Sequence, residues 1–162
     1  MKKLVLLLVF IHSFASVFSQ SPDESKFRLG IGAAYVSEVE STGLGIKGIY
    51  EITEKWEVAL SYSHVFENLG LSWEIVDLDG HFVFFDNDKK LNAYALAGIA
   101  FNFWKRETLL TNDTRTGSYT GLNIGAGLNI ALSKRINLTP ELRGTLFDLS
   151  YTRLGLSVQY MF

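Results

Sequence analysis

The sequence contains no cysteine and only two prolines, and charged residues make up 20% of the chain. Without cysteine, a disulfide framework, a zinc–thiolate site and a cysteine nucleophile are excluded. The formal net charge of −2 offers no electrostatic basis for binding nucleic acid. Apolar residues reach 48% and aromatic residues 14%, and fourteen glycines are present. This composition favours an all-β protein with many tight turns.

The N-terminus has the three parts of a secretory signal peptide. Lys2 and Lys3 precede the apolar run Leu4–Ile11, and the small residues Ser13, Ala15 and Ser16 follow. The apolar run is too short to cross a membrane as a helix. We therefore expect a signal peptide at 1–19, a short periplasmic leader at 20–26 and a mature domain at 27–162. Removal of the two lysines leaves 13 basic residues against 17 acidic ones.

Residues 27–162 alternate apolar and small or polar residues with a period of two, which is the pattern of β-strands. Turn-forming segments such as Thr53–Lys55 and Asp86–Lys90 separate the alternating stretches. The pattern predicts eight antiparallel strands, at 27–36, 43–52, 56–66, 71–85, 91–104, 118–132, 135–147 and 150–162. An even number of consecutive strands suits an up-and-down barrel.

The composition of the second face indicates that the apolar face points to lipid. The second face carries mainly Gly, Ala, Ser, Asn and Thr, whereas a soluble barrel of the lipocalin type would need a densely charged exterior. A narrow membrane barrel requires small side chains inside, with polar groups that satisfy one another. The charged residues expected in the lumen are Arg28, Lys47, Arg143 and Arg153 with Glu51, Glu57, Asp77, Asp79 and Glu141.

The aromatic residues form two groups if the N-terminus starts in the periplasm. Tyr50, Trp56, Phe84, Tyr160 and Phe162 are then expected at the periplasmic end, and Tyr35, Phe66, Trp73, Trp104 and Phe147 at the outer end. Such girdles mark the two membrane boundaries. The turns at Thr53, Asp86 and Ser133 belong to the periplasmic side, and the longest loop, Lys105–Gly117, to the outer side.

Three strands have irregular patterns. In the fourth strand, Trp73 and Ile75 are out of phase with Val76, which suggests a bulge near Ile75–Val76. The fifth strand is apolar or small on both faces, so its inward face is not assigned. Pro140 cannot donate to a ladder, and we expect a local irregularity around it.

Two histidines are candidates for a functional site. His64 lies on the lipid-facing side near the outer end, where a catalytic histidine of a lipid-modifying barrel could lie, but Ser61 and Ser63 lie on the opposite face. An interfacial histidine without catalytic function is the favoured interpretation, and alanine substitution at His64 would test the enzyme. His81 shares a face with Asp77 and Asp79, which favours a lumen hydrogen-bond network over a metal site. No residue is assigned to catalysis, cofactor binding or metal binding.

The final strand, Leu154-x-Leu156-x-Val158-x-Tyr160-x-Phe162, resembles the C-terminal signal of bacterial outer-membrane proteins. With the alternation in 121–130 and the stretch 94–98, it is similar to the outer membrane protein beta-barrel family, which includes OmpX and the membrane domain of OmpA. The resemblance implies an eight-stranded antiparallel transmembrane β-barrel in the outer membrane of a Gram-negative bacterium. It also implies that the assembly machinery recognises the last strand, which ends at Phe162.

The leading functional hypothesis is a non-enzymatic barrel with a structural or interaction role and a side-chain-filled lumen. The alternatives are a narrow channel for small or apolar solutes and, third, a lipid A-modifying enzyme. A continuous water-lined lumen or a lateral gap near Pro140 would favour the channel. Expected partners are outer-membrane lipids, including lipopolysaccharide, and the assembly machinery. We expect a monomer without nucleic-acid partners.

Overall fold

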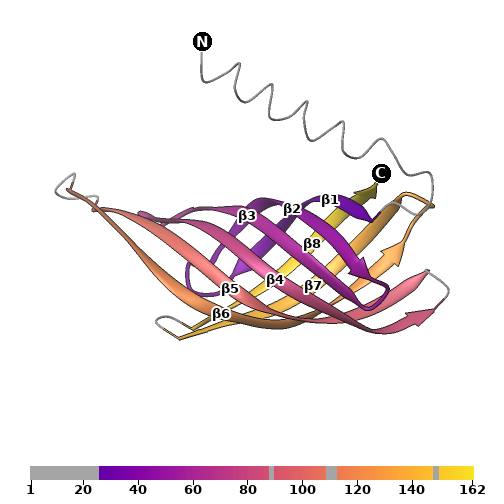
Figure 1. Cartoon of the computed structure of the whole chain (residues 1–162). Helices are drawn as coiled ribbons and strands as arrows, with labels where there is room; N and C mark the ends of the chain where they lie inside the picture. Colours follow the sequence, from indigo (N-terminus) through magenta and orange to yellow (C-terminus); the bar gives the residue numbers. More distant parts are fainter. Residues whose placement is uncertain (1–25, 88–89, 109–112, 148–149) are drawn as a thin grey trace, which may run out of the picture.

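The computed structural model describes residues 26–87, 90–108, 113–147 and 150–162, and these form a closed barrel of eight antiparallel strands (Figure 1). Each strand pairs with its neighbours in sequence, and β1 pairs with β8 to close the barrel. The strands are β1 (Phe27–Val36), β2 (Ser41–Thr53), β3 (Trp56–Asn68), β4 (Leu71–Asn87), β5 (Leu91–Thr108), β6 (Asp113–Ala131), β7 (Ile136–Phe147) and β8 (Tyr151–Met161).

The structure confirms the predicted fold class and the position of all eight strands. In the part of the chain that is described, no helix has the length and hydropathy of a transmembrane segment. The predicted signal peptide at 1–19 and residues 20–25 of the predicted leader lie outside the described residues.

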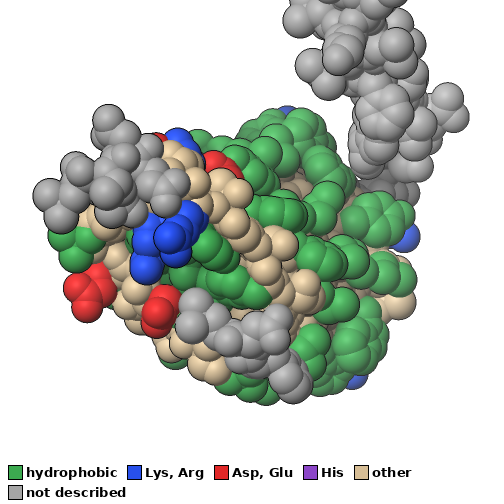
Figure 2. Space-filling view, turned by 90° about the vertical axis from the view of Figure 1, so that its left-hand side faces the viewer, with side chains coloured by type: hydrophobic (Ala, Val, Ile, Leu, Met, Phe, Trp, Pro, Cys, Tyr) green, Lys and Arg blue, Asp and Glu red, His purple; other side chains and the backbone are tan. Residues whose placement is uncertain are grey.

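The alternation along the strands separates two faces, as predicted. The outward face is apolar: Ile31 is 66% exposed and Leu154 is 62% exposed. The inward face holds small and polar residues that are largely buried. Figure 2 looks along the barrel and shows hydrophobic side chains over its flank, with charged ones gathered at the near end. An apolar flank on a closed sheet leaves no unpaired strand edge in hydrocarbon.

The barrel has two different ends. At the terminal end, β1 begins, β8 ends and the connections β2–β3, β4–β5 and β6–β7 turn back. At the far end, β5 and β6 extend as a long hairpin, visible at the left of Figure 1. The predicted loop Lys105–Gly117 is therefore wrong for most of its length, because Lys105 pairs with Thr116 and Thr108 with Asp113 in a continuous ladder.

The hairpin is tied to the neighbouring turn of β3 and β4. Glu107 N–H donates to the Gly70 carbonyl at 2.7 Å. Leu69 and Gly70 both have positive φ, of 50° and 79°, as a two-residue turn of the hairpin type requires. A Cβ at Gly70 would collide with the Glu107 carbonyl, so glycine is required at this contact.

The predicted bulge in β4 near Ile75–Val76 is wrong. The ladder between β3 and β4 runs in one register from Trp73 to Phe82, and the irregularity between β4 and β5 lies at Val83–Phe85. Trp73 and Ile75 are out of phase with Val76 because they point into the lumen, where they are 2% and 0% exposed. The alternation pattern predicts that large apolar residues face lipid, whereas these two fill the interior.

The structure assigns the inward face of β5, which the sequence left open. Tyr94, Leu96, Ala100 and Asn102 are buried inside the barrel, and Trp104 packs against the same interior cluster as Trp73. The aromatic group predicted for the periplasmic end lies at the terminal end of the barrel, and all five of its side chains are exposed. At the far end Tyr35 and Phe66 face outward as predicted, whereas Trp73 and Trp104 turn inward. The side chain of Phe147 lies outside the described residues.

The expected irregularity at Pro140 is present on one side of β7. The ladder with β6 omits the partners of Pro140 and Thr139, while the register on both sides of the gap is the same. Thr139 Oγ1 donates to Asn129 Oδ1 at 2.9 Å across this gap. A side-chain bond thus bridges the strands where the backbone donor is missing.

Candidate functional site

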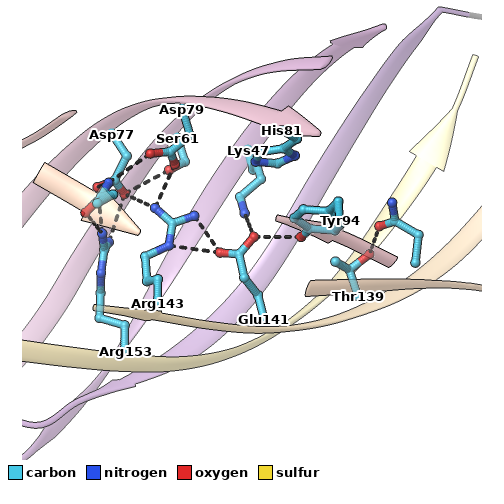
Figure 3. Close-up of polar contacts among 12 residues, drawn as sticks. Lys47, Ser61, Asp77, Asp79, His81, Tyr94, Thr139, Glu141, Arg143 and Arg153 are labelled. Carbon is cyan, nitrogen blue, oxygen red and sulfur yellow. Dashed lines mark hydrogen bonds and ion pairs between the residues drawn. The ribbon is translucent and has the colours of Figure 1, made fainter. Parts of the chain in front are cut away.

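The centre of the lumen holds a network of buried charges from opposite walls of the barrel (Figure 3). Arg143 of β7 is 4% exposed and reaches across to β4. Its Nη1 lies 2.8 Å from Asp79 Oδ2 and 3.2 Å from Asp77 Oδ2. Its Nε donates to Glu141 Oε1 at 3.0 Å. Because strand alternation places all four side chains inside, Arg143 bridges three carboxylates.

Asp77 receives the largest number of donors in this network. Arg153 of β8 binds it with both terminal nitrogens, at 2.8 and 2.6 Å. Ser61 Oγ donates to Asp77 at 3.0 Å, and Asn123 Nδ2 donates at 2.9 Å to both Asp77 and Asp79. Thr145 Oγ1 in turn donates to Asn123 Oδ1 at 2.8 Å. Charge-assisted bonds of this kind hold their partners in fixed geometry.

Glu141 closes the network on the side of the terminal end. Lys47 Nζ of β2 and the Tyr94 hydroxyl of β5 both donate to Glu141 Oε2 at 2.7 Å. Three cationic and three anionic residues therefore meet: Lys47, Arg143 and Arg153 with Asp77, Asp79 and Glu141. Formal neutrality and several hydrogen bonds per carboxylate offset the cost of burying these charges.

A second charged layer lies nearer the terminal end. Arg28 pairs with Glu57 at 2.5 Å, and His81 Nδ1 lies 3.4 Å from the other oxygen of Glu57. The His81 ring stacks on Tyr94, with ring centroids 4.4 Å apart. His81 thus belongs to the predicted lumen network, but it contacts Glu57 and not the two aspartates that share its strand face.

The lumen near the far end is apolar and aromatic. The cluster, called here the far-end plug, consists of Val36, Val39, Val65, Trp73, Ile75 and Tyr151, with Leu71, Trp104 and Tyr119 packed against it. The Trp73 ring meets Tyr151 at 5.1 Å and Tyr119 at 5.5 Å in edge-to-face geometry. Such pairs are a stable way to fill space. The plug closes the lumen beyond the charge network.

The nine charges predicted for the lumen all lie on the inward phase of their strands, as the residue pairing and burial show. Their mutual pairing was expected only in general terms, because sequence does not give register. The plug was missed. The sequence does contain an indication of the plug in β4, where Trp73 and Ile75 are large and apolar but occupy positions that alternate with the lipid-facing residues.

His64 lies on the outward face, as predicted, and its ring nitrogen Nδ1 is 2.6 Å from Glu74 Oε1. The Tyr62 hydroxyl donates to the other oxygen of Glu74. Ser61 is directed into the lumen, and Ser63 lies on the same inward phase and lines an interior cavity. Glu74 was not singled out from the sequence, although the hairpin register places it opposite His64. Tyr62, His64 and Glu74 form a polar cluster on an otherwise apolar flank.

No group of three His, Asp or Glu side chains among the described residues is arranged to hold a metal ion. Asp77 and Asp79 are instead engaged by Arg143, Arg153 and Asn123. The chemistry available in the lumen is ion pairing and hydrogen bonding.

Comparison with known proteins agrees with this geometry. A family model described as "Outer membrane protein beta-barrel domain" matches residues 4–162. No curated protein matches the sequence. The N-terminal β-barrel domain of Pseudomonas aeruginosa OprF is 22% identical with a TM-score of 0.69, and the match covers 86% of this chain and 100% of that one.

Two other solved structures are similar in fold. Neisserial surface protein A is 16% identical with a TM-score of 0.72, and the match covers 85% of this chain and 98% of that one. The attachment invasion locus protein Ail of Yersinia pestis, in complex with the heparin analogue sucrose octasulfate, is 21% identical with a TM-score of 0.61, covering 86% and 98%. At these identities the structures establish the fold.

Proposed function

Because this chain belongs to the outer membrane protein beta-barrel family and is an integral outer-membrane barrel, we propose that it is a non-enzymatic structural or interacting protein that does not conduct solutes. The terminal end faces the periplasm, and the far end faces outward. The protein works as a monomer, since within the barrel wall every strand is paired on both sides. The assembly machinery recognises β8, which ends beside the exposed Phe162.

The filled lumen is the observation that carries this proposal. Arg143 spans the barrel at its middle, and the far-end plug closes it beyond. The interior of an eight-stranded barrel is narrow enough for side chains to block it at these two heights. A path for bulk solute would require both layers to move. The gap in the ladder at Pro140 is bridged by Thr139 and Asn129, which argues against a lateral exit.

We expect the folded protein to give no conductance steps in planar lipid bilayers. Its folded state is checked by the mobility shift between boiled and unboiled samples on a detergent gel, since closed barrels resist detergent until heated. Reproducible steps that vanish when the sample is boiled first would contradict the proposal and favour the narrow channel.

The hairpin of β5 and β6 is the surface best placed for an interaction. It extends beyond the barrel end and carries Arg106 directly opposite Arg115 in the ladder, while Lys105 lies on the other face of the hairpin and pairs with Glu107. A guanidinium binds sulfate and phosphate groups with charge-assisted hydrogen bonds, so two arginines side by side suit an anionic ligand. The Ail complex with a sulfated sugar supports the same ligand class for this chain. We assign phosphorylated sugars of lipopolysaccharide as the biological ligand.

Neutralising the hairpin cations should weaken the binding of an anionic sugar. For Lys105→Gln combined with Arg106→Gln and Arg115→Gln, we expect sucrose octasulfate and purified lipopolysaccharide to bind at least about tenfold more weakly, because each charged bond is worth about 1.5–3 kcal/mol. Calorimetry in detergent at low and high salt measures this, since salt screens exposed charges. Lys134→Gln with Arg135→Gln, at the terminal end, is the control. Equal binding by both variants would contradict the proposed surface.

A further inference from the structure

The lumen contains two cavities at different heights. The first, called here the vestibule, opens at the terminal end, has a volume of about 640 Å³ and is lined by Arg28, Glu57 and Asn137 among others. The second, the inner cavity, has a volume of about 80 Å³ and lies against the glycine-rich wall of β1, β2 and β8, where Gly30 and Ser157 line it. One water needs about 10–15 Å³ of such volume, so the inner cavity can hold several waters.

A layer of buried polar side chains separates the two cavities. Gln159 is 1% exposed and stands opposite Gly30 on one side and Asn137 on the other. Gly30 lines the inner cavity and Asn137 lines the vestibule, so Gln159 lies between them. A Cβ at Gly30 would lie 3.0 Å from Gln159 Cγ, which shows how closely this side chain approaches the glycine wall.

This layer lacks hydrogen-bond partners among the described residues. Both amide atoms of Gln159 and the Oδ1 of its neighbour Asn137 are buried without a partner there. Buried polar atoms are almost always satisfied by protein or by ordered water, since leaving one unsatisfied costs about 1–3 kcal/mol. Several orphaned atoms in one layer, next to two cavities, therefore indicate water in the layer itself.

The inner cavity ends at the far-end plug. Val36, Val65 and Ile75 line the cavity and belong to the plug, where Trp73 and Tyr151 continue the apolar packing. Apolar side chains offer water no hydrogen bonds. A path for water from the far end is therefore closed by the same residues that bound the cavity.

We propose that the lumen is a blind, water-filled pore that admits water and small polar solutes from the terminal end only. Solutes enter the vestibule, pass the Gln159 layer and reach the inner cavity, where the plug stops them. The vestibule is lined by four basic and four acidic residues, so it favours neither sign of charge: Lys26, Arg28, Lys134 and Arg135 with Glu51, Glu54, Glu57 and Asp86. This inference goes beyond the proposed function, which requires only that nothing passes through.

The absence of cysteine allows a direct test with single-cysteine variants. Ser157→Cys places a thiol in the inner cavity, and Thr145→Cys places one at a position that is 1% exposed and lines neither cavity. Folded protein in detergent is treated with small methanethiosulfonates carrying a trimethylammonium or a sulfonate group, and modification is followed by mass spectrometry. We expect Ser157→Cys to react with at least one reagent, and Thr145→Cys at least about tenfold more slowly, because it reacts only through local opening.

The route of entry is tested by closing the terminal side. Asn137→Phe, or Gln159→Phe as a second closing variant, is combined with Ser157→Cys, and folding is checked by heat-modifiability. We expect the modification to be lost. Equal reactivity at 145 and 157, or no reaction at 157, would overturn the water-filled pore and leave a non-conducting function intact. Unchanged reaction in both closed variants would overturn entry from the terminal end. Conductance by the unmodified protein would instead count against the proposed function.

Discussion

Arg143→Met is expected to lower the free energy of unfolding by about 3–5 kcal/mol, because it leaves buried carboxylates without their shared cation. Glu141 keeps Lys47 and Tyr94, and Asp77 keeps Arg153. Asp79 loses its arginine partner and retains Asn123. Urea unfolding from lipid vesicles, followed by tryptophan fluorescence and by gel mobility, measures the loss.

A second substitution separates the charge effect from lost packing. Arg143→Met leaves the Asp79 carboxylate without its arginine partner, and Asp79→Asn removes that buried charge. The double variant should therefore regain part of the lost stability. Lys55→Met is the matched control in an exposed turn, and a surface change of this kind alters stability by no more than about 0.5 kcal/mol. If Arg143→Met were as stable as Lys55→Met, the buried network would not hold the barrel together.

The membership of this network could be predicted from sequence, but its pairing could not. A period of two fixes which side of the wall a residue occupies, so Glu141 and Arg143 had to share a face. Which partner each meets depends on strand register and on the shear of the closed barrel, neither of which is encoded in one strand. The pair Asp79 and Arg143 is 64 residues apart in the chain.

The failed predictions share a physical cause. Hydrophobicity indicates the lipid-facing side only while the lumen is polar, and near the far end the lumen is filled by Trp73, Ile75 and Trp104. The alternation of apolar and polar residues in β4 therefore suggests a bulge, although the strand keeps one register through this region. Similarly, the threonine-rich hairpin arms at 105–108 and 113–117 resemble a loop in composition, but backbone pairing beyond the membrane needs no apolar face.

The charge network and the far-end plug fill the lumen at different heights. The charge network needs partners from several strands and tolerates water beside it, whereas the far-end plug excludes water by packing alone. A barrel sealed at one end and hydrated at the other can keep buried charges satisfied without forming a channel. The glycine wall of β1, β2 and β8 leaves the space in which this occurs.

Gly98→Ala is expected to lower the free energy of unfolding by about 1–3 kcal/mol, the usual cost of overpacking a filled interior. Gly98 of β5 stands opposite Asp79 in β4 and Asn123 in β6. A Cβ there would collide with the Leu78 carbonyl and lie 2.6 Å from Asp79 Cα. Because backbone atoms cannot swing aside, the sheet would have to shift, and it would carry Asp79 away from Arg143. Urea unfolding from lipid vesicles measures the change.

Gly144→Ala is the matched control for Gly98→Ala, since it adds the same methyl group to a strand of the same barrel. A Cβ at Gly144 meets nothing within 4 Å. Glycine within a strand is itself unfavourable by about 0.5–1 kcal/mol relative to alanine, so this variant should be neutral or slightly more stable. Equal stability of the two variants would show that the close approach of β5 to β4 is not a constraint. A loss confined to Gly98→Ala would show that the charge network depends on how closely its supporting strands pack.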